Sequence, residues 1–352
     1  MLYLKSGVCE RTEAVDPSKS LSQLDRLFNE GRPFFSKDSL RNIQEQLQQP
    51  LKKGDRIRIL DLSDVPVFFE VKTGDCQAHL RAGDIVYTAN EPTIQYVSYQ
   101  SLRKRIETVS ESPDLAFCSL RIQHTLIRHN NITGEPADDS KFKSKDEVHR
   151  LFSAALEIWE ESGIWAEIKR TLSSTATAGK ITKIIGFGCG IMSASDDVPH
   201  ISYNAAFQHA LLLTLQQFLR QSSSHEITCA VQDPAYTDRD ISVLYSHGIE
   251  ILKDPEGFIQ ADDSSLVFAC APDVPVRQIV ADIARPAVLM WDRVSSSDDL
   301  TADPDSPRIR KMICDSYDCF DFPYDEHFGD MAIYVRRDLN SQGQFAQIDT
   351  IA

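Results

Sequence analysis

The chain has 352 residues, of which 42% are hydrophobic and 25% are charged. A chain of this length can bury a large core, either as one large domain or as a domain with a substantial annex. Its net charge of -15 argues against DNA binding and against broad RNA binding, because neutralising phosphates needs a positive face. The sequence holds no apolar run near the roughly 20 residues of a membrane helix, so no membrane partner is expected, and its N-terminus does not resemble a signal peptide.

The eight cysteines are scattered without a Cys-x-x-Cys pair, and no histidine pairs with a cysteine at ligand spacing. This pattern favours reduced thiols and a cytoplasmic protein, and it predicts neither a metal site nor a bound cofactor. Cys229 and Cys270 lie in apolar runs that are typical of buried strands. For both, we expect inert packing.

Residues 1–131 predict an α+β module. A helix is expected over 36–47, where Leu40, Ile43 and Leu47 recur at helical spacing behind a capping serine. The β-rich segments of this module are expected at 56–62, 65–71, 82–88 and 91–100. Residues 132–141 are rich in turn formers and charge, which predicts an exposed connection to the next domain.

Residues 144–337 predict a Rossmann-like α/β domain, in which helices flank a mostly parallel sheet. Ser144 and Glu147 have the spacing of a capping box, which begins a helix, and a second helix is expected after Gly163. Further on, strands are expected at 183–187, 227–232, 249–252, 265–270 and 286–291, and helices at 203–220, 238–247 and 274–283. Such alternation implies parallel strands with right-handed crossovers. We then predict a loop over 295–308, a closing strand over 328–337 and a polar tail over 338–352.

The turn after the first of these strands carries three glycines, Gly186, Gly188 and Gly190. Glycines at this place let a ligand approach the backbone closely. A dinucleotide site would place the third glycine one residue later and lead straight into a helix. Here a loop with Asp196 and Asp197 intervenes, and these carboxylates would repel a pyrophosphate unless a cation offset them. We predict that the five residues bind another substrate, the alternative being a tight turn without a ligand.

Asp233 follows the second strand of the α/β domain. Pro234 biases it toward an extended conformation at the carboxyl end of that strand, where a crevice is expected. A binding role is one interpretation. The other is a turn or capping acid, because a helix begins just beyond Thr237.

Small nucleophilic side chains follow the glycines. Cys189 at a helix N-terminus would be stabilised as a thiolate, and Ser193 or Ser195 could act if a base such as His200 or His209 lay close. Small residues in a tight turn are the alternative explanation for all three.

An acidic and aromatic cluster occupies residues 314–329 and includes Asp315, Asp318 and Glu326. Acids among aromatic rings suit a cationic group such as guanidinium, although they also suit a divalent metal or a solvated loop. Basic residues gather at 103–105, 141–145 and 308–311. In an acidic protein these are the candidate contacts to RNA phosphates, although short charge runs are commonly solvated.

Three motifs occur in order that together resemble the sensitivity-to-red-light-reduced (SRR-like) domain: Gly186-Phe-Gly, Phe207-Gln-His-Ala-Leu-Leu-Leu and Gln232-Asp-Pro. The resemblance covers roughly residues 183–295. It implies a family linked to circadian and stress regulation. The N-terminal extension with Pro33-Phe-Phe-Ser, and the acidic C-terminal cluster, are more similar to a fungal branch of secondary metabolism whose members resemble arginine-containing cyclodipeptide synthases.

The resemblance to these synthases implies an aminoacyl transferase that joins aminoacyl groups from two charged tRNAs into a diketopiperazine. The acids Asp233, Asp315 and Asp318 would then be catalytic, and Glu326 would bind substrate. The Asp-Asp-x-x-Glu motif of the family is absent, because Ser316 and Cys319 stand at its second and last acidic places. A noncatalytic SRR-like regulatory or ligand-binding protein is the alternative, and a nucleotide-cofactor enzyme is a weaker one.

Overall fold

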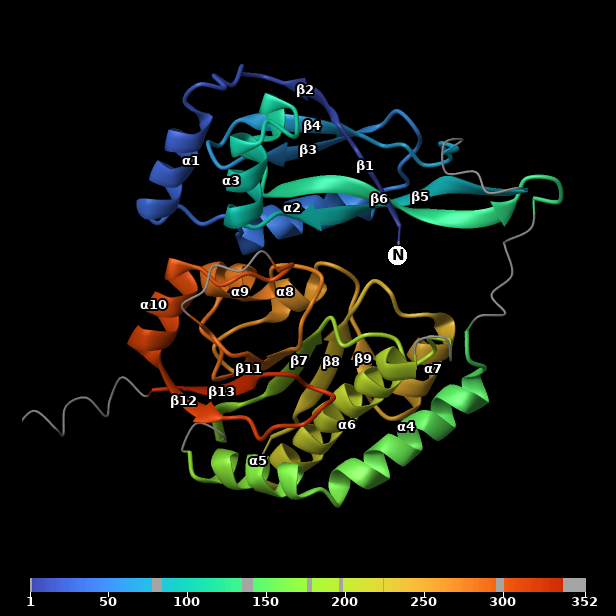
Figure 1. Cartoon of the computed structure of the whole chain (residues 1–352), viewed down its shortest axis with the longest axis vertical. Helices are drawn as coiled ribbons and strands as arrows, with labels where there is room; N and C mark the ends of the chain where they lie inside the picture. The colour runs from blue at the N-terminus through green and yellow to red at the C-terminus, as the bar shows by residue number, and fades with distance from the viewer. Residues whose placement is uncertain are drawn as a thin grey trace, which may run out of the picture.

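The computed structural model describes residues 2–77, 84–134, 142–175, 179–195, 199–223, 225–295 and 301–337. Within these ranges, two three-stranded sheets lie in the N-terminal part of the chain and one seven-stranded sheet in the C-terminal part. Figure 1 shows the two parts stacked on one another, with the N-terminal part in blue to green. The predicted polar tail over 338–352 lies outside the described residues. No described helix combines the length and apolar character needed to cross a membrane.

The N-terminal part is an α+β arrangement of antiparallel strands and short helices. Its first sheet has the order β1 (Tyr3–Lys5), β6 (Leu120–Asn130), β5 (Ile85–Tyr96), and its second has the order β2 (Val8–Arg11), β4 (Pro66–Glu70), β3 (Arg56–Leu60). Its helices are α1 (Ser20–Asn29), α2 (Lys37–Leu47) and α3 (Tyr99–Glu107), followed by a 3-10 turn at Pro113–Leu115. The helix predicted over 36–47 and the strands predicted at 56–62 and 65–71 are confirmed. The long strand β6 is not among the predicted elements.

The seven-stranded sheet is mostly parallel, as predicted. Its order is β12 (Tyr317–Asp321), β13 (Met331–Arg336), β11 (Val288–Asp292), β10 (Ser265–Ala269), β7 (Lys183–Phe187), β8 (Thr228–Gln232), β9 (Glu250–Ile251). Strands β7 to β11 run parallel, whereas β13 runs antiparallel to both β11 and β12. The parallel strands confirm the predicted segments to within two residues.

Two elements near the C-terminus differ from the prediction. Part of the loop predicted over 295–308 is the start of α10 (Pro307–Ser316), because Ser306 caps the helix and proline suits its first position. The acidic cluster is not a loop throughout, since its middle forms β12 against β13. The cluster is therefore folded back along the sheet edge.

Helices cover both faces of this sheet. Helices α4 (Lys145–Glu160), α5 (Gly163–Ser173), α6 (Pro199–Ser222) and α7 (Asp238–Ser246) pack on one face, and α8 (Glu256–Gln260), α9 (Val276–Ile283) and α10 on the other. Neighbouring strand residues such as Ile184 and Ile185 belong to opposite cores, because successive side chains of a strand point to opposite faces. The predicted capping box of Ser144 and Glu147 is present at the start of α4.

The two parts of the chain share a hydrophobic core. Residues of α1 to α3 and of the small sheets pack with α8, α9 and α10 in one continuous cluster. Asp282 on α9 accepts hydrogen bonds from the backbone N–H groups of Phe34 and Phe35, at 2.7 and 3.1 Å. The guanidinium of Arg308 lies 4.2 Å from the ring centroid of Phe28. The N-terminal part thus covers the α8–α10 face of the large sheet.

A buried carboxyl group lies at this junction. Asp254, just after β9, accepts hydrogen bonds from the Tyr96 hydroxyl at 2.6 Å and the Gln232 amide at 2.9 Å. Burial raises the pKa of Asp254 from 3.8 to about 7, although the hydrogen bond from Tyr96 opposes this shift. The folded chain therefore holds the Asp254 proton more tightly than the unfolded chain does.

This difference predicts a fall in stability with rising pH. Between pH 4 and 7 the unfolded state loses the Asp254 proton first, so the free energy of unfolding decreases across that window and is flat for this group above it. The Asp254→Asn variant should lose this part of the pH dependence, because an amide does not ionise. Its oxygen can accept the same two hydrogen bonds. Urea denaturation at pH 4, 5.5 and 7 measures the effect. Asp38→Asn, which removes a carboxylate with a fully exposed side chain, is the control, and an equal change of slope in both variants would contradict the assignment.

Candidate functional site

A large crevice opens at the carboxyl ends of β7, β10 and β11. Its volume is about 940 Å³, and it is lined by residues from the glycine turn, α6, the segments after β10 and β11, and the segment between β12 and β13. The chain leaves β7 toward β8 and β9 on one side and returns through β10 and β11 on the other. Ligand sites of open α/β sheets lie at such a reversal of strand order.

Two of the three glycines line this cavity. Gly188 and Gly190 have positive φ angles, 61° and 76°, and both contribute backbone to its wall. A Cβ on Gly188 would lie 2.9 Å from Pro272, so the close approach of these two segments requires glycine. Gly186 is different, because it lies inside β7 and does not line the cavity. Its position differs from the substrate-binding role predicted for it, and its surroundings indicate a packing role.

Asp233, the predicted acid that follows β8, does not line the cavity. Asp233 accepts hydrogen bonds from the backbone N–H of Gly190 and of Ala235, both at 2.9 Å, and it is absent from the cavity wall. This geometry matches the turn-acid interpretation, because both carboxylate oxygens hold backbone. Asp196 and Asp197 lie outside the described residues.

Cys189 is held in a buried chain of neutral groups. Its thiol contacts the hydroxyl of Tyr236, which lies 2.7 Å from Nε2 of His209, and Nδ1 of His209 lies 2.6 Å from the Ala205 carbonyl. Burial lowers the pKa of His209 to about 4, so Nδ1 donates to the carbonyl and Nε2 accepts from Tyr236. Burial raises the pKa of the Cys189 thiol well above its usual value, and the charge of Asp233 adds to this shift. The thiolate needed for the proposed nucleophile is disfavoured.

Ser193 also has a structural role. It is fully buried, and its hydroxyl and backbone N–H donate to Asp240 at 2.7 and 2.9 Å. Asp240 at the same time completes the capping box of Thr237 at the start of α7. Ser193, one of the candidate nucleophiles, thus ties the glycine loop to α7 and does not line the cavity.

The structure separates the acids of the C-terminal cluster. Asp315, at the end of α10, pairs with Lys311 at 2.7 Å, and Asp318 on the edge strand β12 lies 3.8 Å from Arg337. Both are exposed and neither lines the cavity. The prediction that they share a site with the glycine turn is therefore wrong in geometry. Glu326, by contrast, lines the cavity opposite Gly188 and Gly190.

The predicted basic contacts to RNA are largely engaged within the protein. Arg103 and Arg105 form ion pairs with acids of the N-terminal part. Arg308 lies over an aromatic ring of α1, and Lys311 pairs with an acid one turn later. Lys141 lies outside the described residues. Arg103, Arg105, Arg308 and Lys311 thus have partners within the protein.

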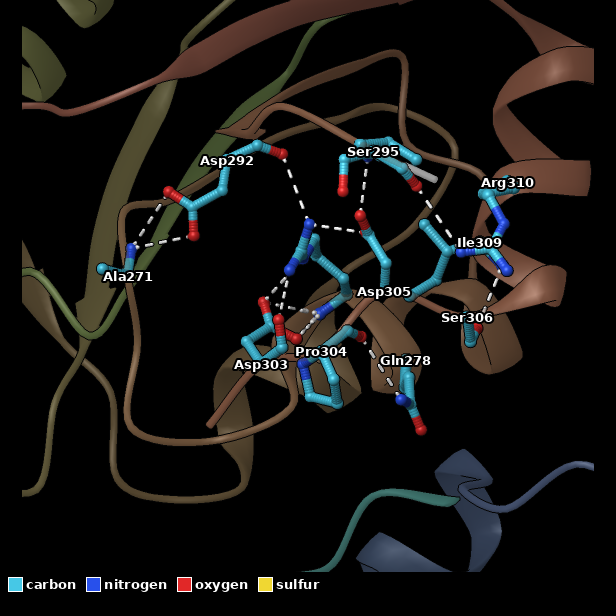
Figure 2. A network of polar contacts seen from close by, with 12 residues as sticks. Ala271, Gln278, Asp292, Ser295, Asp303, Pro304, Asp305, Ser306, Ile309 and Arg310 are labelled. Carbon is cyan, nitrogen blue, oxygen red and sulfur yellow. Dashed lines mark hydrogen bonds and ion pairs between the residues drawn. The ribbon is translucent and has the colours of Figure 1, made fainter. Parts of the chain in front are cut away.

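A buried network shapes one wall of the cavity (Figure 2). The backbone N–H and Nε of Arg277, on α9, donate to Asp303, and its Nη1 donates to Asp305 at 2.7 Å. Asp305 also accepts from the backbone N–H of Ser295 at 2.7 Å. Charges buried this deeply persist because they are paired and hydrogen-bonded. Arg277 is therefore saturated by acids and is not available to an anionic ligand.

The sequence analysis missed the pair Asp325 and His327. Nδ1 of His327 lies 2.7 Å from Oδ1 of Asp325, and the ring stacks on Phe207 with centroids 3.8 Å apart and planes at 17°. His327 lines the cavity. With Nδ1–H donated to the carboxylate, the neutral ring has Nε2 as its basic atom. The signal in the sequence was Asp-x-His beside an acidic cluster, but only the fold of β12 against β13 brings it to the crevice.

No group of three or more histidine, cysteine or acidic side chains among the described residues has the geometry to hold a metal ion. The chemistry that the site offers is that of carboxylates, one imidazole and backbone groups of the glycine turn. Such a set can bind a cationic group and move a proton.

Gly186 provides a test of its packing role. A Cβ there would lie 2.7 Å from Cδ1 of Leu212 and 2.9 Å from Sγ of Cys189. Gly186→Ala should therefore lower the free energy of unfolding by about 1–3 kcal/mol, the usual cost of overpacking, as measured by urea denaturation. Gly179→Ala, where a Cβ meets nothing within 4 Å, is the matched control and should change little. Unchanged stability of Gly186→Ala would contradict the packing assignment.

Cys189 provides a second test. Iodoacetamide at pH 8 should modify the exposed Cys314 and Cys319 and leave Cys189 unmodified in the folded protein, because alkylation requires an accessible thiolate. Peptide mass spectrometry after a timed reaction measures each site, and the unfolded chain serves as the control in which all cysteines react. Rapid modification of native Cys189 would show that the thiol is activated after all.

Comparisons with known proteins bear on the identity of the C-terminal part. Among curated proteins, no match was found. Among solved structures, an O-methyltransferase family protein from Burkholderia thailandensis matches 55% of this chain and 62% of its own, with 10% identity and a TM-score of 0.29. The chain thus spans less than two thirds of that structure. The SRR1 domain model matches residues 164–335. These findings do not support the finer resemblance to the fungal synthase branch, but the last match supports the SRR-like domain family for residues 164–335.

Proposed function

We propose that the crevice is the active site of an enzyme that acts on a small molecule with a cationic amine or guanidinium group. The observation that carries this proposal is the His327 imidazole, oriented by Asp325, in the wall of an acid-lined cavity. A base held in one tautomer beside a site for a positive charge is suited to remove a proton from a bound amine.

The charge of the cavity wall supports a cationic ligand. Six carboxylates line it against two guanidinium groups, and the latter are already paired. The carboxylates are those of Asp273, Asp292, Asp303, Asp305, Glu326 and Asp330. Asp303 and Asp305 pair with Arg277, and Asp330 is one of the two partners of Arg293. The carboxylates of the wall therefore outnumber its guanidinium groups, and its net charge is negative. This negative charge would repel an anionic ligand, whereas an ammonium or guanidinium group would reduce it.

Asp292 is the most enclosed of the acids that are not in an ion pair. Both of its carboxylate oxygens accept from the single backbone N–H of Ala271, at 3.3 and 3.2 Å. Burial raises the pKa of Asp292, and the Arg277 guanidinium opposes that shift. One N–H does not satisfy the lone pairs of a carboxylate. A cationic donor in the cavity would complete its hydrogen bonding and favour its charged form.

Aminoacyl transfer is the reaction of this class that the sequence resemblance favours. In it, the α-amine of one aminoacyl group attacks the ester carbonyl of the other, and a tRNA hydroxyl leaves. The second amine then closes the diketopiperazine and releases the second tRNA. His327 would take the proton of the attacking amine and return it to the leaving oxygen, so no external oxidant or nucleotide is needed. The cavity acids would hold an arginine side chain.

This proposal differs from the sequence-based hypothesis in its residues. Asp233, Asp315 and Asp318 lie outside the cavity wall, so His327, Asp325 and Glu326 take the catalytic and binding roles here. Charged tRNAs remain proposed partners. The noncatalytic regulatory protein remains the alternative, and it would use the same crevice for binding alone.

Turnover in bacteria tests the proposal. Cells that express the whole chain should accumulate arginine-containing cyclic dipeptides, detected by mass spectrometry against cells with an empty vector. His327→Ala should reduce the product at least about 100-fold, the usual loss for a missing general base. His149→Ala, which alters an exposed histidine on α4 outside the cavity, should retain the product.

The contrary outcomes are distinct. Undiminished product with His327→Ala would remove His327 from the mechanism. Absence of product from the unaltered chain, together with no binding of arginyl-tRNA in filter assays, would contradict aminoacyl transfer and favour the noncatalytic alternative.

A further inference from the structure

One side chain in the cavity wall is buried and lacks a hydrogen-bond partner. Gln208 lies on α6 between Phe207 and His209, is 7% exposed and lines the cavity. Its Oε1 is enclosed and accepts no hydrogen bond. A buried amide oxygen without a donor destabilises the fold, because it has lost its hydrogen bonds to water, and here the residue that bears it lines the crevice.

The neighbours of Gln208 on α6 have other partners. His209 is fixed by Tyr236 and the Ala205 carbonyl, and Phe207 is stacked on His327. Both flanking side chains are therefore engaged in different directions around the helix. Gln216, two turns later on the same helix, is buried as well, but its amide donates to the Ile227 carbonyl at 2.9 Å. A buried glutamine of α6 can thus be satisfied within the protein, whereas the one that lines the cavity is not.

We propose that Gln208 selects ligands that carry N–H donors, by accepting a hydrogen bond from the ammonium or guanidinium group of the substrate. This inference rests on the proposed binding of a cation in the crevice, and it narrows that class. The acids attract any cation, including one without N–H groups, because charge alone is not directional. The amide oxygen adds a directional requirement that a trimethylated ammonium cannot meet.

Two ligand pairs separate the two requirements. Lysine and trimethyl-lysine both have a positively charged side chain, but only the side chain of lysine donates N–H bonds. Arginine and citrulline both donate N–H bonds from the side chain, but only the arginine side chain is charged. Isothermal titration of the whole chain should show that lysine binds at least roughly ten-fold more tightly than trimethyl-lysine, the loss expected when a hydrogen bond to a charged group is removed. Arginine should likewise bind at least roughly ten-fold more tightly than citrulline, because the cavity acids attract the charge of its side chain.

Variants of Gln208 assign the N–H preference. Gln208→Met, which keeps the length of the side chain, should bring lysine and trimethyl-lysine to within about two-fold of each other. Gln208→Glu offers only acceptor oxygens and should preserve or increase the preference for lysine. Gln216→Met is the matched control on the same helix. It removes a buried hydrogen bond and should lower stability while leaving the preference intact, and thermal unfolding of each variant confirms that it is folded.

The outcomes distinguish this inference from the function beneath it. If lysine and arginine bind but Gln208→Met keeps the full preference over trimethyl-lysine, the role of Gln208 is overturned and the cation site stands. Loss of the preference in Gln208→Glu would also overturn it, because an acceptor would then not be the relevant group. If citrulline binds as tightly as arginine, or no cation binds the unaltered chain, the proposed cation site itself fails.

Discussion

The pairing of β7 with β10 is the constraint on which the site depends. The chain leaves β7 for β8 on one side and reaches β10 on the other, so the segments that follow β7 and β10 diverge above the sheet edge. The first turns of α6 close one side of the resulting space, and the segment between β12 and β13 closes another. Because β13 is antiparallel to β11, the turn that precedes it arrives at the same edge. Glu326 and His327 of the C-terminal cluster line the same cavity as the glycine turn through this arrangement.

The parallel strands could be predicted closely because their signals are local. Four of the five are short apolar runs with residues buried on both faces, and Lys183–Phe187 is followed directly by Gly188. The hairpin of β12 and β13 could not be predicted in the same way. Asp318 and Asp321 make β12 polar, since it lies at the sheet edge, and such a sequence resembles a solvated loop. Asp318 was a candidate only through the resemblance to the synthases, and no local pattern marks His327 as a residue that the hairpin brings to the cavity.

In the candidate site, too, some features follow from the local sequence and others depend on distant contacts. Gly188 and Gly190 line the cavity with positive φ angles, and glycine is the residue that adopts this conformation most readily, so a glycine-rich turn is a local signal for such backbone. The role of Asp233 depended on which partners it finds, and those are backbone N–H groups 43 and two residues away. Likewise, Phe207, Gln208 and His209 appear in sequence as one motif. In the structure Phe207 stacks on His327, Gln208 lines the cavity and His209 lies 2.7 Å from the buried Tyr236 hydroxyl. They differ because successive helical residues point about 100° apart.

The central claim is that a cationic small molecule occupies the crevice at the β7–β10 reversal. A crystal structure of the whole chain soaked with L-arginine tests it most directly. The account predicts electron density for the guanidinium group within hydrogen-bond distance of Asp292 or Glu326, with the α-amine facing His327. Density at the exposed edge formed by Asp315 and Asp318, with the crevice occupied by water alone, would contradict it.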